Sequence, residues 1–339
     1  MDGQKTVIAF KGFDKDLKCH GFQYEIGKGY ELPAYGKQPL VCNYGFHACE
    51  NPLDVLLFYF INQSCEISRF CKVEQSGMMS VDARNIKTAS SKIHILEEMT
   101  VEQFVKCCAN YIYEKHLSNI TSFISEYDET TKKFSSILND DGKKETNVVL
   151  KTSFASAYIS GFASTAYIRN IRDFVESTGS YQKIVMDFEC QEVNTSGGFV
   201  TVCSTGFYSK IKSSGHNANI VSAGYKPEIH STGNFAKIAV FDHNAFIEST
   251  GYESMIYVAG HSSRIRVSGS CTKVNVVGER AEIVCLGPHC RVKATIGSKI
   301  TLVEWSETEN IPVSIKTEIV DGERIKAGVW YIIRNGKFE

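Results

Sequence analysis

The strongest constraint on the fold is a β-branched residue that recurs at every ninth position between Gly179 and Val292. Five positions before nearly every one of these residues stands a glycine, and only Phe188 and Asp242 break that rule. A nine-residue unit cannot bury its own apolar side, so neighbouring units must stack on one another. The pattern therefore predicts a solenoid. Its β-branched residues are Ile184, Val193, Val202, Ile211, Ile220, Ile229, Ile238, Ile247, Ile256, Ile265, Val274, Ile283 and Val292.

The number of nonapeptides in one coil is predicted from the side chains that would stack. Residues one coil apart lie at the strand spacing of ~4.8 Å, where like side chains tend to align. A step of 27 residues aligns Tyr181, Tyr208 and Phe235, whereas a step of 18 gives mixed columns. We therefore predict a right-handed parallel β-helix with three sides and 27 residues per coil. The glycines are expected at its corners, where a left-handed backbone costs least without a Cβ.

The rest of the chain divides by composition and local signals. Residues 1–126 predict an α+β domain, 127–150 a polar linker, 151–302 the β-helix and 303–339 a C-terminal hairpin cap.

Local signals place helices and strands in the flanking segments. In the first domain, Asn51 followed by Pro52 predicts the start of one helix, and Thr100 with Gln103 forms a capping box for a second. Strands are expected at 6–10, 70–73 and 93–96. In the tail, residues 311–320 and 323–333 are expected to pair around Asp321-Gly322.

The amino-acid composition says more about the cellular environment of the protein than about its function. Lysine and arginine number 37 against 38 acidic residues, so the overall charge favours no class of partner. The start of the sequence lacks a secretory signal, and the longest apolar run, Val55 to Ile61, is too short to span a membrane. We therefore expect a soluble cytoplasmic protein that does not contact membranes and whose twelve cysteines are reduced thiols.

A coil of 27 residues would gather basic residues on one side. Stacked like charges repel one another unless something anionic compensates them, so this side predicts a face for nucleic acid, a nucleotide or an acidic protein. Two alternatives are a merely solvated face and docking onto the acidic side of a second copy. The same coil would stack His216 on His243. The predicted anion-binding face consists of Lys183, Lys210, Lys212, Lys237, Arg264, Arg266, Arg291 and Lys293.

Two segments of the first domain carry a family resemblance. The stretch from Ala9 to Glu31 contains KGFDKDLKC, and the stretch from Gly45 to Val55 is GFHACENPLDV. Together they resemble a family of uncharacterised phage and bacterial proteins that often carry this module ahead of Ser/Gly/Ala/Ile repeats. The resemblance implies a phage or prophage origin, a bacterial cytoplasm as the location and a role in phage–host conflict. It implies no agreed activity.

A more distant resemblance concerns ADP-ribosyltransferases. Lys11-Gly12, Gly45-Phe46-His47, Tyr59 and Glu74 are similar to the motifs of those enzymes in their order. The resemblance implies NAD as cofactor, bound by Lys11, Gly12 and His47. It further implies that Tyr59 stacks on nicotinamide and that Glu74 stabilises an oxocarbenium-like transition state. The alternative is that residues 45–49 form a strand before the Asn51-capped helix, with Tyr59 in its core.

Metal binding and other catalytic motifs receive less support. Cys42, His47 and Cys49, with Cys19-His20 upstream, suggest a zinc site, but their spacing matches no standard zinc motif. The aspartate that recurs in calcium-binding nonapeptide rolls is absent from the repeats. We therefore expect no metal.

The leading hypothesis is a non-enzymatic binding protein that engages an anionic or protein partner through the basic face of its β-helix, without a cofactor. NAD-dependent ADP-ribosyl transfer and a structural or self-associating role are the alternatives. No Gly-x-Ser-x-Gly, P-loop or His-Glu-x-x-His motif supports a hydrolase or an NTPase.

Overall fold

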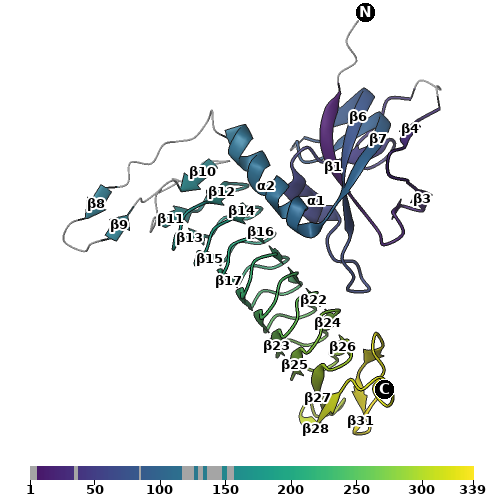
Figure 1. Cartoon of the computed structure of the whole chain (residues 1–339), viewed down its shortest axis with the longest axis vertical. Helices are drawn as coiled ribbons and strands as arrows, with labels where there is room; N and C mark the ends of the chain where they lie inside the picture. Colours follow the sequence, from purple (N-terminus) through teal and green to yellow (C-terminus); the bar gives the residue numbers. More distant parts are fainter. Residues whose placement is uncertain are drawn as a thin grey trace, which may run out of the picture. The chain divides into compact units, whose positions relative to one another are not determined.

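The computed structural model describes residues 6–33, 37–83, 85–116, 126–128, 133–135, 147–150 and 156–339. The chain forms two compact units, Met1–Tyr111 and Ile112–Glu339 (Figure 1). Within the described ranges, no helix is both long enough and apolar enough to cross a membrane.

The first unit is built on a five-stranded antiparallel sheet. Its strand order is β1-β6-β7-β4, and β5 pairs with the remaining part of β7. The strands predicted at 6–10, 70–73 and 93–96 are present and extend beyond those limits. The strands of this unit are β1 (Val7–Phe13), β4 (Gly29–Glu31), β5 (Phe46–Ala48), β6 (Arg69–Val81) and β7 (Thr88–Met99), with the small hairpin β2 (Lys18–Cys19) and β3 (Phe22–Gln23).

Both predicted helix starts are confirmed. Helix α1 (Pro52–Phe58) begins after Asn51, whose side chain accepts a hydrogen bond of 3.0 Å from the Leu53 N–H. Helix α2 (Val101–His116) begins with the capping box. In that box the Gln103 N–H donates to Thr100 Oγ1 (3.2 Å), and the Thr100 N–H donates to Gln103 Oε1 (2.8 Å). These bonds satisfy N–H groups that the first helical turn leaves without partners.

The second unit is a parallel β-solenoid with about eight coils between residues 156 and 302. Its strands alternate between two sheets, which we name sheet F and sheet G. A small hairpin pairs β8 (Glu126–Asp128) with β9 (Lys133–Ser135). The parallel strands of sheet F are β10 (Asn147–Leu150), β12 (Thr165–Ile168), β14 (Lys183–Met186), β16 (Thr201–Ser204), β18 (Asn219–Ser222), β20 (Lys237–Val240), β22 (Met255–Val258), β24 (Lys273–Val276) and β26 (Arg291–Lys293). Those of sheet G are β11 (Ser156–Ile159), β13 (Phe174–Ser177), β15 (Glu192–Thr195), β17 (Lys210–Ser213), β19 (Glu228–Ser231), β21 (Phe246–Ser249), β23 (Arg264–Val267), β25 (Glu282–Cys285) and β27 (Lys299–Trp305).

Each coil contains two nonapeptides and two strands, so the predicted three-sided coil of three nonapeptides is wrong. Ile184 pairs with Val202 and Ile211 pairs with Ile229, in each case two nonapeptides further along the chain. The interior ladder of β-branched residues is the same for both kinds of coil and could not decide between them. The prediction depended on like charges in one column, but a column of alternating acids and bases is more favourable. The first strand, β10, also lies inside the segment 127–150 that was predicted as linker.

The repeat glycines have a different role from the one expected. The left-handed backbone falls two positions later, on residues such as Tyr181 (φ 60°), Cys190 (φ 55°) and Phe199 (φ 58°). The glycine is required because the corners of successive coils touch. A Cβ on Gly197, for example, would lie 1.8 Å from the carbonyl oxygen of Gly179. Close approach of stacked backbones therefore selects glycine at this position.

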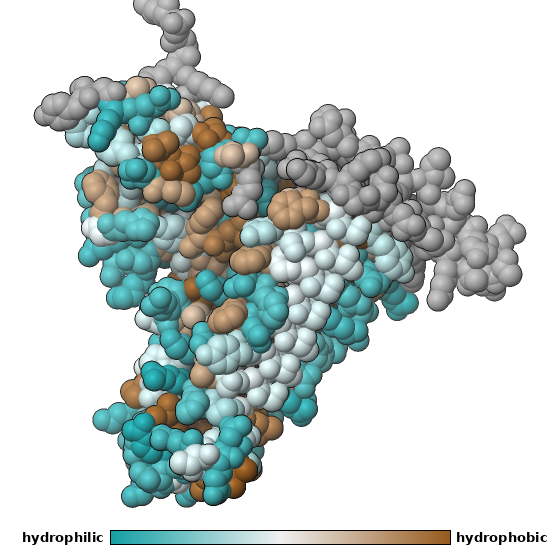
Figure 2. Space-filling model, turned by 180° about the vertical axis from the view of Figure 1, so that it is seen from behind, coloured by the Kyte–Doolittle hydropathy of each residue, from teal (hydrophilic) through white to brown (hydrophobic). Residues whose placement is uncertain are grey.

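The solenoid interior follows the expected period of two. Ile184 is buried, and Gln182 and Met186, two positions before and after it, are buried as well. The same rows of β-branched, small and hydroxyl side chains repeat from coil to coil. Figure 2 shows surface rows of similar hydropathy that run along the length of the solenoid.

The C-terminal strands close the end of the solenoid, as predicted, but with different partners. β28 (Pro312–Ile319) pairs antiparallel with β27, and not with residues 323–333. β29 (Trp330–Tyr331) pairs with β26, while β30 (Ile333–Arg334) and β31 (Lys337–Phe338) form a hairpin around Asn335-Gly336. Tyr331 belongs to the solenoid core, and Ile333 and Phe338 pack against it. β28 thus pairs with the open edge of β27, whereas the turn at Asp321-Gly322 was expected to pair it with residues 323–333.

Candidate functional site

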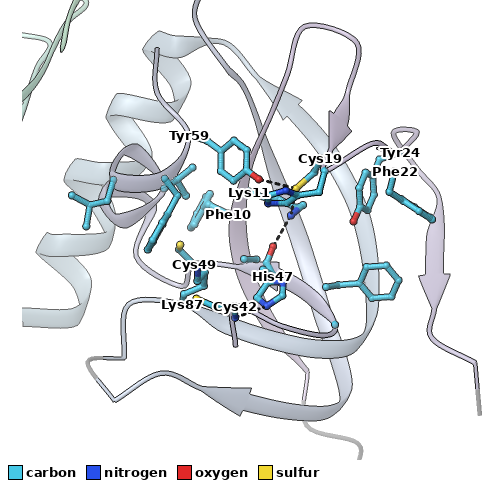
Figure 3. A pocket seen from close by; sticks show the side chains of 18 of the residues that line it. Phe10, Lys11, Cys19, Phe22, Tyr24, Cys42, His47, Cys49, Tyr59 and Lys87 are labelled. Atoms are coloured by element: carbon cyan, nitrogen blue, oxygen red, sulfur yellow. Dashed lines mark hydrogen bonds between the residues drawn. The ribbon is translucent and has the colours of Figure 1, made fainter. Parts of the chain in front are cut away.

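A cavity of about 780 Å³ lies in the first unit. Its wall combines β1, the β2–β3 hairpin, the segment from Cys42 to Cys49, the end of α1 and Lys87. Figure 3 shows that the labelled side chains of these separate segments surround one space. The lining residues are Phe10, Lys11, Gly12, Cys19, His20, Phe22, Tyr24, Cys42, Asn43, Gly45, Phe46, His47, Ala48, Cys49, Val55, Leu57, Phe58, Tyr59 and Lys87.

Local backbone geometry places His47 at this cavity. Gly45 has a φ of 119°, and a Cβ there would lie 3.1 Å from the Ser90 carbonyl oxygen, so glycine suits this turn. The following strand, β5, pairs with β7 through Phe46 and Ser90. The buried Gln75 side chain donates to the Phe46 carbonyl at 2.7 Å and fixes the strand from the sheet side. His47 is thereby held on a rigid strand between a turn and helix α1.

Lys11 is the unusual residue of the cavity because it is a buried lysine that contacts no carboxylate of the residues that the structure describes. Only 4% of the Lys11 surface is exposed to solvent. The ammonium donates to the His47 carbonyl oxygen at 2.8 Å and to Cys19 Sγ at 3.4 Å. Burial lowers the pKa of Lys11, although Cys19 acts in the opposite direction. A buried cation without an anionic partner is costly, so this geometry suits a ligand that brings the missing negative charge.

Aromatic rings surround the Lys11 ammonium. The ring centroids of Phe13, Tyr24 and Tyr59 lie 5.4, 5.6 and 6.0 Å from Nζ. At these distances the electron-rich ring faces attract a cation. These rings attract the ammonium but carry no formal negative charge, so they do not supply its counter-charge.

His47 adds a polar group whose protonation is defined by its neighbours. Its Nε2 accepts a hydrogen bond of 3.0 Å from the Cys42 N–H, so the neutral ring carries its proton on Nδ1. Burial lowers the pKa of His47, and the charge of Lys11 lowers it further. The imidazole is therefore neutral at physiological pH and can donate one hydrogen bond.

Tyr59 connects helix α1 to the cavity floor. Its hydroxyl lies 2.9 Å from Cys19 Sγ, and its Cβ packs directly on Gly12. Burial raises the pKa of Tyr59, and the hydrogen bond with Cys19 raises it further. The phenol, the Cys19 thiol and the Lys11 ammonium thus form a continuous polar row across the cavity (Figure 3).

The lowered pKa of Lys11 predicts how the stability of this unit depends on pH. Between the folded pKa of Lys11 and its ordinary value of ~10.4, the unfolded chain binds more protons than the folded one. The free energy of unfolding should therefore rise with pH in that window, by up to ~1.4 kcal/mol per pH unit. We expect Lys11→Met to remove this contribution, measured as the difference in pH slope between the variant and the unmodified protein in urea unfolding followed from pH 7 to about 10.4. The same slope in the variant and the unmodified protein would contradict this prediction.

Six of the seven residues that resemble ADP-ribosyltransferase motifs line the cavity. These are Lys11, Gly12, Gly45, Phe46, His47 and Tyr59. Glu74 does not line it. Glu74 lies in the middle of β6, opposite Ile8 and His94, between two buried residues whose side chains project from the other face of the sheet. The structure thus brings Tyr59 together with the residues that the resemblance implies for NAD binding, but it does not bring Glu74 to them.

Tyr24 and Lys87 were not predicted from the sequence, and Cys19 was predicted only as a metal ligand. One signal for the site was visible in AFKGF, where Lys11 alternates in phase with the apolar Ala9 and Phe13. A lysine at a core position of a strand indicates a functional or paired group. Lys87 and Tyr24 gave no such signal, because they reach the cavity only through tertiary folding.

The residues of the suggested zinc site are Cys42, His47 and Cys49, with Cys19 and His20 upstream. Across the described parts of the chain, no group of three histidine, cysteine or acidic residues is arranged to hold a metal ion. The Nε2 atom of His47 is already engaged by the Cys42 N–H. None of the twelve cysteines forms a disulfide.

The eight residues of the predicted basic face do not share one face. The coil of two nonapeptides places four of them on each sheet. The single basic stripe was therefore predicted wrongly, because it followed from a coil of three nonapeptides. On sheet G the basic residues alternate with acids: Lys212 contacts Glu192 at 2.9 Å and Lys210 contacts Glu228 at 3.4 Å. Sheet F carries Lys183, Lys237, Arg291 and Lys293, and sheet G carries Lys210, Lys212, Arg264 and Arg266.

The histidine ladder is likewise displaced by the shorter coil. His243 stacks on His261, with ring centroids 4.8 Å apart, and not on His216.

Comparison with known proteins finds a family match for part of the first unit, and that match carries no activity. Residues 7–107 match a family model described as a domain of unknown function, DUF7666. The match covers the sheet and the cavity and ends within α2. No curated protein and no solved structure matches the chain.

Proposed function

We propose that the first unit binds a small anionic ligand that carries an aromatic ring, and that this ligand is a nucleotide. One observation carries the proposal: the cavity is lined by two lysines and two histidines, and its lining residues include no aspartate or glutamate. A phosphate placed beside Lys11 would supply the counter-charge that this buried ammonium lacks. Lys87 at the other wall could engage a second anionic group.

The remainder of the lining supports a ring-bearing ligand. Phe22, Tyr24 and Phe46 form an edge-to-face cluster with centroids 4.8 to 6.4 Å apart. Such rings provide faces on which a nucleobase can stack. The cavity volume of about 780 Å³ also lies within the ~300–1,000 Å³ usual for ligand pockets.

The proposed activity is binding without glycosidic cleavage. ADP-ribosyl transfer requires an anionic group near the developing oxocarbenium ion. The cavity lining offers no carboxylate, and Glu74 lies elsewhere on the sheet. NAD remains an admissible ligand because it is a nucleotide, but no nicotinamide release is expected.

We therefore propose that the anionic partner binds in the cavity of the first unit and not on the solenoid. The paired charges on sheet G leave less uncompensated positive potential there than a single basic stripe would. The solenoid serves instead as a rigid platform that accompanies the ligand-binding unit. A phage protein acting in the bacterial cytoplasm, as the resemblance implies, would have nucleotides and reducing conditions at hand.

The proposal is tested by comparing AMP with adenosine. Isothermal titration with the full chain should show that AMP binds and that adenosine binds at least tenfold more weakly, because it lacks the phosphate. Lys11→Met should weaken AMP binding by about 10- to 100-fold, the loss of one charge-assisted contact worth ~1.5–3 kcal/mol. Lys92→Met is the matched control, because Lys92 pairs with Glu31 and does not line the cavity.

Two results would contradict the proposal. Equal affinity for AMP and adenosine would show that the cations do not select an anion, and an unchanged affinity in Lys11→Met would place the site elsewhere. Incubation with NAD separates binding from transfer. Nicotinamide release that is lost in Glu74→Gln would instead establish the enzymatic alternative.

A further inference from the structure

We propose that the C-terminal strand β28 is a dimerisation edge, which pairs antiparallel with β28 of a second copy of this chain around Thr317. Within the described chain, β28 is the last strand of sheet G and pairs with β27 alone. Its other edge therefore presents a row of backbone donors and acceptors. Native proteins usually blunt such an edge or cover it.

The side chains of this edge strand are unusually apolar for an exposed position. Val313, Ile315 and Ile319 are 62%, 63% and 58% exposed, and all three project from the outer face of sheet G. Figure 2 shows hydrophobic surface at the end of the molecule that holds these C-terminal strands. β-Branched residues on an open edge are the pattern expected of a strand that pairs with another strand.

The backbone directions restrict the register of this pairing. The Val320 N–H donates to the Ser298 carbonyl on the β27 side (2.9 Å), so residues 318, 316 and 314 also point toward β27. Residues 315, 317 and 319 consequently direct their N–H and C=O groups toward the open edge. A two-fold axis through Thr317 makes Thr317 face its own copy and places Ile315 opposite Ile319 of the other copy.

The charges favour a second copy over an unrelated partner. In the register centred on Thr317, Lys316 of each strand lies opposite Glu318 of the other, so each Glu318, which contacts Arg324 of its own chain, gains a second cation. The same register pairs the exposed isoleucines twice. A surface that complements itself in hydrogen bonds, charge and apolar side chains is what a two-fold interface requires.

Sedimentation velocity of the full chain tests this proposal. We expect the unmodified protein to sediment as a dimer at micromolar concentration. Thr317→Pro should shift it to monomer or raise the dissociation constant at least tenfold, because proline removes the central edge N–H, a group that β27 does not use. Thr317→Ala loses the same hydroxyl contact with Thr301 but keeps the N–H, so it should remain dimeric.

A second variant keeps the test decisive if proline disturbs folding. Lys316→Glu places two like-charged pairs across the interface and should also yield monomer, with circular dichroism unchanged. The proposal is overturned if the unmodified protein is monomeric at every soluble concentration. It is equally overturned if folded Lys316→Glu and Thr317→Pro both remain dimers.

Discussion

Replacing Gly197 by alanine should destabilise the solenoid by about 3 kcal/mol or more, the upper range for inserting a group into a closely packed site. The added Cβ would lie 1.8 Å from the carbonyl oxygen and 2.4 Å from the carbonyl carbon of Gly179. Both obstacles are backbone atoms of the coil below, so no side chain can rotate away. Urea unfolding followed by circular dichroism should show a lower midpoint for the variant.

The neighbouring residue provides a matched control for this prediction. A Cβ on Gly198 would meet its nearest atom, the His216 carbonyl oxygen, at 3.6 Å, which is an ordinary contact. Gly198→Ala should therefore change stability by less than ~1 kcal/mol, since both variants add the same methyl to the same turn. Equal destabilisation of the two variants would show that backbone flexibility, and not contact between coils, explains the repeat glycines.

The sequence predicted the repeat unit, but it could not predict how many units make a coil. The period of nine places Ile184 and its equivalents in the interior whether a coil holds two repeats or three. Only the outward-facing residues distinguish the two arrangements. Which arrangement they favour depends on whether like or opposite charges stack in one column. Lys210 stacks on Glu228, so residues of opposite charge are neighbours in this column. Aligning lysines with lysines therefore selected the wrong step and, with it, a single basic face whose eight residues in fact lie on two different sheets.

The cavity was predictable only in part, for a related reason. Lys11 and His47 lie next to conspicuous glycines and aromatic residues in the sequence, and both line the cavity. Glu74 fits a catalytic motif by its order along the chain, but order does not indicate the face of a strand. Lys87 comes from the loop between two long strands, and its distance from the other lining residues depends on how that hairpin bends. Tertiary placement of this kind leaves no local pattern.

Gly12→Ala should damage both the stability and the binding capacity of the first unit. A Cβ at Gly12 would lie 2.2 Å from the Cβ and 2.9 Å from the Cγ of Tyr59, and 3.2 Å from a methyl group of Val55. Tyr59 would have to move together with the end of helix α1. We expect a loss of about 2–3 kcal/mol in the free energy of unfolding and at least a tenfold loss of AMP affinity, since Tyr59 forms part of the cavity wall.

A control and a double mutant separate local crowding from a general intolerance of alanine. At Gly29, on β4 of the same sheet, an added Cβ meets its nearest atom at 4.0 Å, so Gly29→Ala should be nearly neutral. Tyr59→Gly removes the atoms that obstruct the new methyl. The double variant Gly12→Ala/Tyr59→Gly should therefore be less destabilised than the sum of its single changes, by ~1 kcal/mol or more. Strict additivity would mean that contact with Tyr59 is not the reason for glycine at position 12, and the cavity floor would then have to be held by other contacts.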